Sequence, residues 1–200
     1  MASHRFENLV VHTYDWMQGY IHVYTESNDD FDYFYVAGLN TKSLASMSVA
    51  RERLWLLDYE NTPFSYGNWP GAWMREHYAL AGTHTFGNSS ISAFVHPDNL
   101  GNVDRSVRFT NGIEMNWVPV EYKRNSGDAV AVELVFGAPT KRLDAYQIFL
   151  HLLDSEGKLI AGNDIGPYNN LRPTVTWSAG EIVHSPHALL LPFDIVAGEL

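Results

Sequence analysis

The chain has 200 residues, of which 13 are basic and 23 acidic, so its formal charge is −10. This acidic balance argues against nucleic acid as a partner, and the absence of cysteine excludes disulfides and thiolate metal sites. Hydrophobic residues make up 46% of the chain, which is enough for a globular core and excludes a disordered protein.

The N-terminal part of the chain alternates between helix and strand signals. Aromatic residues at helical spacing predict a helix over Asp15–Glu26, and strands are expected at Asp32–Ala37 and Ile91–His96. The apolar run within Arg53–Tyr59 is flanked by charges, which is typical of a strand covered on both faces. The alternation predicts a small α/β layer over residues 1–97.

A second helix is predicted to begin after Asn68, which can cap its first turn. Pro70 suits that first turn, and Gly82 is expected to end the helix. Within it, Trp69 and Trp73 are four residues apart and therefore share one helix face.

Residues 105–200 have almost only strand and turn signals. Asp128–Gly137 alternates with a period of two, and Tyr146–Leu153 is a second apolar strand. Asp154–Gly157 then offers a turn with glycine where a positive φ is needed, so a hairpin is expected. Further strands are expected at Arg105–Asn111, Glu114–Glu121, Lys158–Ala161, Val175–Trp177, Glu181–Val183 and Ala188–Leu191.

This density of short strands predicts an antiparallel, Ig-like β-sandwich over residues 105–200. The fold class is therefore α+β and mostly β, with the boundary between the two parts near residues 97–105. Buried positions are expected at Trp55, Leu57, Val132, Leu134, Phe136, Ile148, Leu150 and Leu152. His151 and Trp177 are expected to be structural rather than functional.

Two groups of residues suggest chemistry, and each has an ordinary structural alternative. Asp58 and Glu60 follow a strand, and two carboxylates could serve glycoside hydrolysis, but a solvated strand end is the favoured interpretation. His184 and His187 could bind a metal. However, Pro186 between them prevents a helix in which both would share one face, and the spacing places no third ligand. No catalytic, cofactor-binding or metal-binding residue is therefore assigned, and no cofactor is implied.

The chain is rich in aromatic residues, with 6 Trp, 11 Tyr and 10 Phe. Phe64, Tyr66, Trp69 and Trp73 lie close together in sequence and could form a platform for a sugar ring. The alternative, which is favoured, is that Trp69 and Trp73 pack the helix onto the sheet. Tyr168, in a loop rich in Gly, Asn and Pro, is the fifth candidate for a ligand contact.

The second half of the chain carries an ordered set of motifs. They are Phe149 with His151 and Leu152, Asp154 with Gly157, Arg172–Thr174 with Trp177, Gly180 with Glu181, and Pro192 with Gly198 and Glu199. In this order they resemble the C-terminal β-sandwich of bacterial polyprenyl-phosphate-dependent membrane glycosyltransferases, which are mannosyltransferase-like and of Chloroflexi type. A weaker resemblance to the same family covers Asp15–Trp16, Arg53–Leu56, Trp73–Leu80 and Thr83–His96.

The resemblance implies a noncatalytic, extracytoplasmic accessory domain, because the family's membrane helices and catalytic acidic residues have no counterpart here. Neither a signal peptide nor a membrane-spanning stretch is visible in the sequence. Relatives continue into a last strand, so a sandwich lacking that strand after Leu200 is expected. The implied partners are a glycan or the membrane glycosyltransferase itself. Two alternatives stay open: a stand-alone carbohydrate-binding module, and a glycosidase that uses Asp58 and Glu60.

Overall fold

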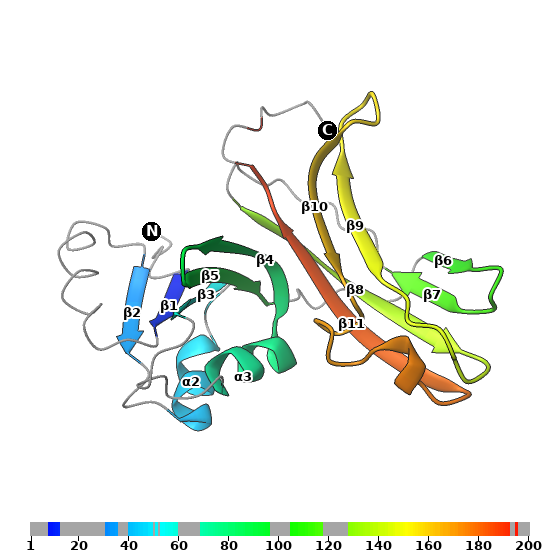
Figure 1. Cartoon of the computed structure of the whole chain (residues 1–200), viewed down its shortest axis with the longest axis horizontal. Helices are drawn as coiled ribbons and strands as arrows, with labels where there is room; N and C mark the ends of the chain where they lie inside the picture. The colour runs from blue at the N-terminus through cyan, green and yellow to red at the C-terminus, as the bar shows by residue number, and fades with distance from the viewer. Residues whose placement is uncertain are drawn as a thin grey trace, which may run out of the picture. The chain divides into compact units, whose positions relative to one another are not determined.

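The structure, a computed structural model, describes residues 8–12, 31–35, 40–49, 51, 53–59, 69–96, 105–117, 128–192 and 195. The protein is mostly β, with antiparallel sheets and a small α/β part. Its contacts divide it into two compact units (Figure 1). The first unit contains Met1–His77 and Thr83–His96, and the second contains Tyr78–Gly82 and Pro97–Leu200.

The first unit is built on a five-stranded sheet in the order β2-β1-β3-β5-β4. Strands β1 (Asn8–His12), β2 (Phe31–Tyr35) and β3 (Arg53–Tyr59) are parallel to one another. Strand β5 (Ser89–Val95) runs antiparallel to β3 and forms a hairpin with β4 (Ala79–Phe86). Parallel strands need crossover connections, which is why this unit contains helices.

Two short helices lie along one side of this sheet (Figure 1). Helix α2 (Thr41–Ser48) was not predicted from the sequence, although Asn40 is a standard capping residue. The Asn40 side chain accepts hydrogen bonds from the backbone N–H groups of Lys42 and Ser43, both at 3.0 Å. Helix α3 (Trp69–His77) has proline in its first turn, as predicted.

Helix α3 ends earlier than predicted. The sequence prediction extended it to Gly82, whereas the helix ends at His77 and the following residues form β4. Ala79, Leu80 and Ala81 favour helix intrinsically, but all three are buried in the strand conformation. Tertiary packing therefore outweighs local propensity at this point.

Strand β3 has the predicted bounds, but its buried face was assigned wrongly. Leu54 and Leu56 are buried, whereas Trp55 and Leu57 are only half-buried. An apolar run without alternation does not reveal which face is covered more completely. The pairing of β3 between β1 and β5 and the helices on one side of the sheet decide it.

The second unit contains a four-stranded antiparallel sheet in the order β11-β8-β7-β6. Its members are β6 (Arg105–Arg108), β7 (Glu114–Trp117), β8 (Ala129–Ala138) and β11 (Glu181–Leu190). A separate antiparallel hairpin is formed by β9 (Ile148–Leu153) and β10 (Leu159–Ile165). Gly157 closes it with a φ of +82°, as the sequence predicted.

Strand β11 is one continuous strand, whereas two short strands had been predicted around Pro186. Proline lacks the backbone N–H that a central strand must donate. It is tolerated here because β11 is the edge strand of its sheet. The predicted strand at Val175–Trp177 is instead a 3-10 turn, Thr174–Thr176.

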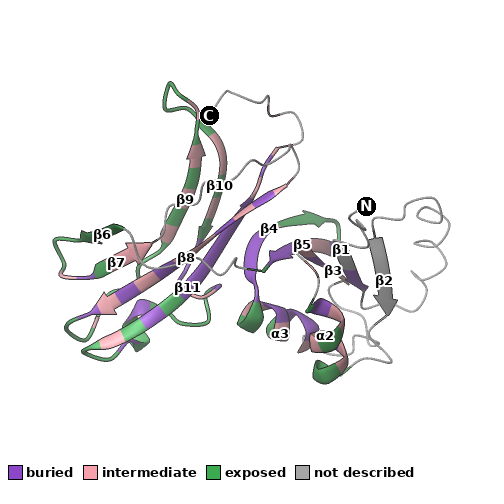
Figure 2. Ribbon diagram, turned by 180° about the vertical axis from the view of Figure 1, so that it is seen from behind, coloured by how far each residue is buried: buried purple, intermediate pink, exposed green. Residues whose placement is uncertain are grey.

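The core of the second unit lies between the sheet and the hairpin. Leu134 and Phe136 are buried, as predicted, and pack with Trp177. The remaining predicted core residues of this unit, Val132, Ile148, Leu150 and Leu152, are half-buried. Figure 2 shows burial concentrated on β8 and β11, while the hairpin β9–β10 is largely exposed or intermediate.

The segment Tyr78–Gly82 is held in the second unit by two asparagine side chains. Asn169 donates to the carbonyl of Tyr78 at 2.6 Å and accepts from the N–H of Leu80 at 3.0 Å. Asn163 donates to the carbonyls of Leu80, at 2.6 Å, and Ala188, at 2.7 Å. These amides therefore satisfy buried backbone groups that a neighbouring strand would otherwise satisfy.

Candidate functional site: an aromatic pocket

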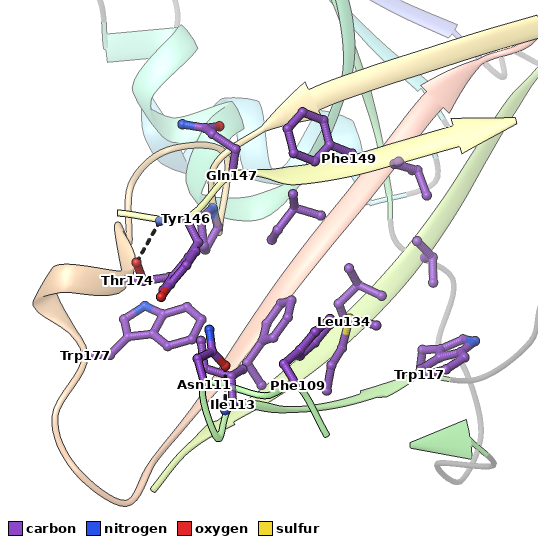
Figure 3. Close-up of a pocket in the computed structure, with 16 residues that line it drawn as sticks. Phe109, Asn111, Ile113, Trp117, Leu134, Tyr146, Gln147, Phe149, Thr174 and Trp177 are labelled. Atoms are coloured by element: carbon purple, nitrogen blue, oxygen red, sulfur yellow. Dashed lines mark hydrogen bonds between the residues drawn. The ribbon is translucent and has the colours of Figure 1, made fainter. Parts of the chain in front are cut away.

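A pocket of about 470 Å³ lies within the second unit (Figure 3). Strands β7, β8 and β9 contribute to it, together with the turn before β7 and the loop that contains the 3-10 turn. Its lining is dominated by rings and aliphatic chains: Phe109, Ile113, Met115, Trp117, Val132, Leu134, Phe136, Tyr146, Ile148, Phe149, Leu150, Pro167 and Trp177. We refer to it as the aromatic pocket.

Trp177 forms one wall of the aromatic pocket and is fixed in place. Its side chain is only 1% exposed, and its indole N–H donates to the carbonyl of Arg172 at 2.9 Å. Its ring lies 5.5 Å from that of Phe136 at an interplanar angle of 40°, a favourable tilted arrangement. The predicted structural role of Trp177 is therefore accompanied by a place in the pocket wall.

Thr174 connects the loop carrying Trp177 to the segment that leads into β9. Its hydroxyl donates to the carbonyl of Asp144 at 2.6 Å and accepts from the N–H of Tyr146 at 3.0 Å (Figure 3). The backbone on both sides of the pocket opening is thereby joined through one buried hydroxyl. This contact positions the ring of Tyr146 at the edge of the pocket.

A left-handed turn precedes the 3-10 turn. Tyr168, Asn169 and Asn170 have φ values of 52°, 55° and 67°, a conformation that is uncommon for residues other than glycine. The side chain of Asn170 accepts from the N–H of Gly166 at 2.8 Å, and the N–H of Tyr168 donates to the hydroxyl of Ser185 at 2.7 Å. These bonds hold the turn whose first residue, Pro167, lines the pocket.

The opening of the aromatic pocket is both aromatic and polar. Phe109 and Tyr146 are exposed there, whereas the ring of Phe149 lies 5.9 Å from that of His151 on the outer face of the hairpin. The side-chain amide of Asn111 is a polar group of the lining, while the side chain of Gln147 points away from the pocket interior (Figure 3). Asn111 already accepts a hydrogen bond from the N–H of Ile113 at 3.0 Å, so its amide N–H₂ is the part that can meet a ligand.

The lining of the aromatic pocket is almost entirely apolar. Its described lining holds no Asp, Glu, His, Lys or Arg, and its threonine hydroxyl is already bonded on both sides. Apolar walls with a few polar groups at the mouth are typical of sites for small molecules. The free energy of binding would come from burying apolar surface and from ring contacts.

The structure accounts for three of the five aromatic candidates from the sequence. Trp69 and Trp73 are half-buried in α3, and the ring of Trp73 stacks on that of His77 at 4.4 Å. Tyr168 lies in the left-handed turn and is half-buried. Phe64 and Tyr66 lie outside the described residues. None of the three described candidates lines the aromatic pocket.

The histidine pair is not a metal site. His184 and His187 are three residues apart in a strand, so they point to opposite faces. His184 is exposed and pairs with Glu133 at 2.9 Å, while His187 is fully buried and bonds to Ser185 at 2.9 Å. Across the described part of the chain, no group of three His, Asp or Glu residues could hold a metal ion.

The other residues considered from the sequence have separate surroundings. His151 is exposed on the face of the hairpin and bonds to Asp164 at 2.9 Å. Asp58 lines a small polar pocket in the first unit, and Glu60 lies outside the described residues. The proposed carboxylate pair is therefore represented by Asp58 alone.

No protein-family model, curated protein sequence or solved structure matches the chain. Among the described helices, none has the length and apolar character needed to cross a membrane. Sequence reasoning missed the aromatic pocket as a site. The motif Arg172–Trp177, which carried part of the family resemblance, was its one available signal, because Thr174 and Trp177 both line the pocket.

Proposed function

We propose that this chain is a noncatalytic, extracytoplasmic accessory domain of a membrane glycosyltransferase and that it binds a glycoconjugate in the aromatic pocket. The apolar part of the ligand enters the pocket, and its sugar lies at the opening. The resemblance of the sequence to that family supports the first half of the proposal. The aromatic pocket is the single observation that carries the second half.

The composition of the pocket supports an apolar group rather than a sugar as the buried part. A sugar has hydroxyl groups around its ring, and each buried hydroxyl needs a hydrogen-bond partner. Inside the pocket the walls are aliphatic and aromatic, and the side-chain amide of Asn111 lies near Trp177 and Ile113 (Figure 3). Exposed Phe109 offers a flat face against which the C–H groups of a sugar can pack.

A series of alkyl glucosides tests this proposal by calorimetry. The sugar stays constant from methyl to octyl glucoside, all used below the concentration at which micelles form. Each added CH₂ that enters the pocket contributes about 0.8 kcal/mol, so affinity should rise roughly threefold to fourfold per carbon until the pocket is full. Burial of the chain should also give a negative heat-capacity change. Equal affinity for methyl and octyl glucoside, or no binding by either, would contradict the proposal.

Two phenylalanine variants locate the binding. Phe109→Ala removes an exposed ring from the pocket opening and should weaken octyl glucoside binding by about fivefold to tenfold, since roughly 1 kcal/mol of apolar contact is lost. Phe86→Ala removes an exposed ring from the first unit and should leave binding unchanged. If both variants bind as the unchanged protein does, the ligand does not occupy the aromatic pocket.

A further inference from the structure

A second pocket, of about 240 Å³, lies in the first unit between the sheet and α3. Its character is the opposite of that of the aromatic pocket, because polar side chains dominate its lining. They are Asp58, Arg75, Thr83, Thr85, Ser90 and Ser92. We refer to these residues as the polar cup.

The sheet brings the polar cup together from three strands. Side chains two residues apart share a strand face, so Ser90 and Ser92 lie side by side on β5, and Thr83 and Thr85 on β4. In the register of β3 and β5, Asp58 lies opposite Ser90. The hydroxyls of Thr83 and Ser92 are 2.9 Å apart, which confirms that β4 presents its threonines to the same face. Four hydroxyls and one carboxylate therefore converge on one patch.

Helix α3 supplies the opposite wall of the polar cup. Gly71 and Arg75 are four residues apart, so they share the helix face that lines the cup. Trp69 and Trp73 are each two positions away, which rotates them by roughly 200° around the helix. Since glycine has no side chain, position 71 leaves space above the sheet.

We propose that the polar cup binds a single neutral sugar ring or cyclic polyol. The carboxylate of Asp58 and the guanidinium of Arg75 carry opposite charges, so the cup has no net charge that would select an ion. Carboxylate oxygens accept, guanidinium groups donate, and serine and threonine hydroxyls do both, which matches the hydroxyls of a polyol. A cavity of about 150 Å³ is enough for a benzene ring. The cup, at about 240 Å³, therefore has space for a six-membered ring with its hydroxyls.

This inference goes beyond the proposed function, because the polar cup and the aromatic pocket are in different units. Two-dimensional amide NMR of the full chain tests it with glucose, galactose, mannose and myo-inositol as probes. At least one probe should shift the signals of the backbone amides of Thr83–Phe86 and Ser89–Val95. The indole N–H signal of Trp177, in the aromatic pocket, should stay in place. No shift of the cup amides with any probe overturns the proposal.

Three variants identify the groups that bind. Asp58→Asn keeps the shape of the side chain but loses a charged acceptor, and it should weaken binding about tenfold to hundredfold. Thr85→Val removes one exposed hydroxyl with little change in volume and should weaken binding about fivefold. Thr41→Val makes the same change elsewhere in the first unit and should have no effect.

The remaining outcomes are decisive as well. Equal binding by Thr85→Val and the unchanged protein would overturn the proposal, even if Asp58→Asn failed to fold. Inorganic phosphate serves as the charged competitor. If phosphate shifts the signals of the cup amides and none of the sugars does, the polar cup is an anion site. That result would also overturn the proposal.

Discussion

The buried imidazole of His187 should make the stability of the second unit depend on pH. His187 has no exposed surface, and its ring bonds to the hydroxyl of Ser185 at 2.9 Å. Its second nitrogen, Nδ1, has no hydrogen-bond partner among the described residues. Burial disfavours the charged ring and lowers the pKa of His187 from 6.5 to about 4.

The direction of the effect follows from the two pKa values. The unfolded chain binds a proton at His187 below pH 6.5, whereas the folded protein binds it only near pH 4. Between these values the unfolded state holds more protons, so stability falls as the pH falls. From pH 7.5 to pH 5.0 this group alone should lower the free energy of unfolding by about 2 kcal/mol. At pH 5.0 the buried ring is still mostly neutral, so the size of the loss is decided mainly by the pKa of His187 in the unfolded chain.

Urea unfolding at pH 7.5 and pH 5.0 measures this loss. The indole N–H signal of Trp177 reports on the second unit alone. His187→Leu removes the titration, so the variant should lose about 2 kcal/mol less than the unchanged protein between the two pH values. His184→Leu, on the exposed side of the same strand, is the matched control and should behave like the unchanged protein. Equal losses for His187→Leu and the unchanged protein would show that the buried imidazole does not cause the pH dependence.

Substitutions at three further positions probe the second unit. Val132→Phe fills part of the aromatic pocket and should weaken octyl glucoside binding at least tenfold, as measured by calorimetry, while urea unfolding shows stability within about 1 kcal/mol. Gly157→Ala should lose about 1 kcal/mol in urea unfolding, because alanine disfavours the positive φ and no neighbour lies near its Cβ. Asn169→Ala should lower the free energy of unfolding by about 3 kcal/mol or more, since Tyr78 and Leu80 lose a buried partner. Asn169→Gly should lower it by about 1 kcal/mol less than Asn169→Ala does, because glycine tolerates the positive φ of the turn. A loss by Asn169→Gly as large as that by Asn169→Ala would contradict the role given to backbone strain.

Local pattern predicted the elements that depend on local chemistry. The bounds of β3 match the prediction, and β8 begins and ends one residue after the predicted strand. Gly157 adopts the positive φ expected of a hairpin glycine. In each case the residue types of one short stretch are enough, because period and turn chemistry act over a few residues.

Local pattern failed where distant contacts decide the conformation. Thr-Val-Thr at residues 174–176 favours a strand intrinsically, yet it forms a 3-10 turn. The N–H of Thr176 bonds to the carbonyl of Pro173 at 2.9 Å, and the buried Thr174 hydroxyl is used by the segment before β9. Contacts some thirty residues away in sequence thus fix this turn, and no window around it contains that information.

Neither pocket could be predicted from the sequence, and the reason is the same for both. The aromatic pocket draws on four stretches of sequence, around Phe109–Trp117, Val132–Phe136, Tyr146–Leu150 and Pro167–Trp177. The alternation T-x-T in β4 and S-x-S in β5 is visible in the sequence, but only the strand order β3-β5-β4 places it beside Asp58. Strand order is a property of the whole fold.

The left-handed turn connects stability to the proposed binding function. Three non-glycine residues in that conformation cost about 1–2 kcal/mol each, or roughly 3–6 kcal/mol together. The four side-chain hydrogen bonds that hold the turn contribute about 0.5–1.5 kcal/mol each, or roughly 2–6 kcal/mol, so cost and gain are close. Because Asn169 holds the segment Tyr78–Gly82 while Pro167 lines the aromatic pocket, loosening the turn should disturb both at once. Asn169 and Asn170, which do not line the aromatic pocket, would then influence the affinity of the pocket for its ligand.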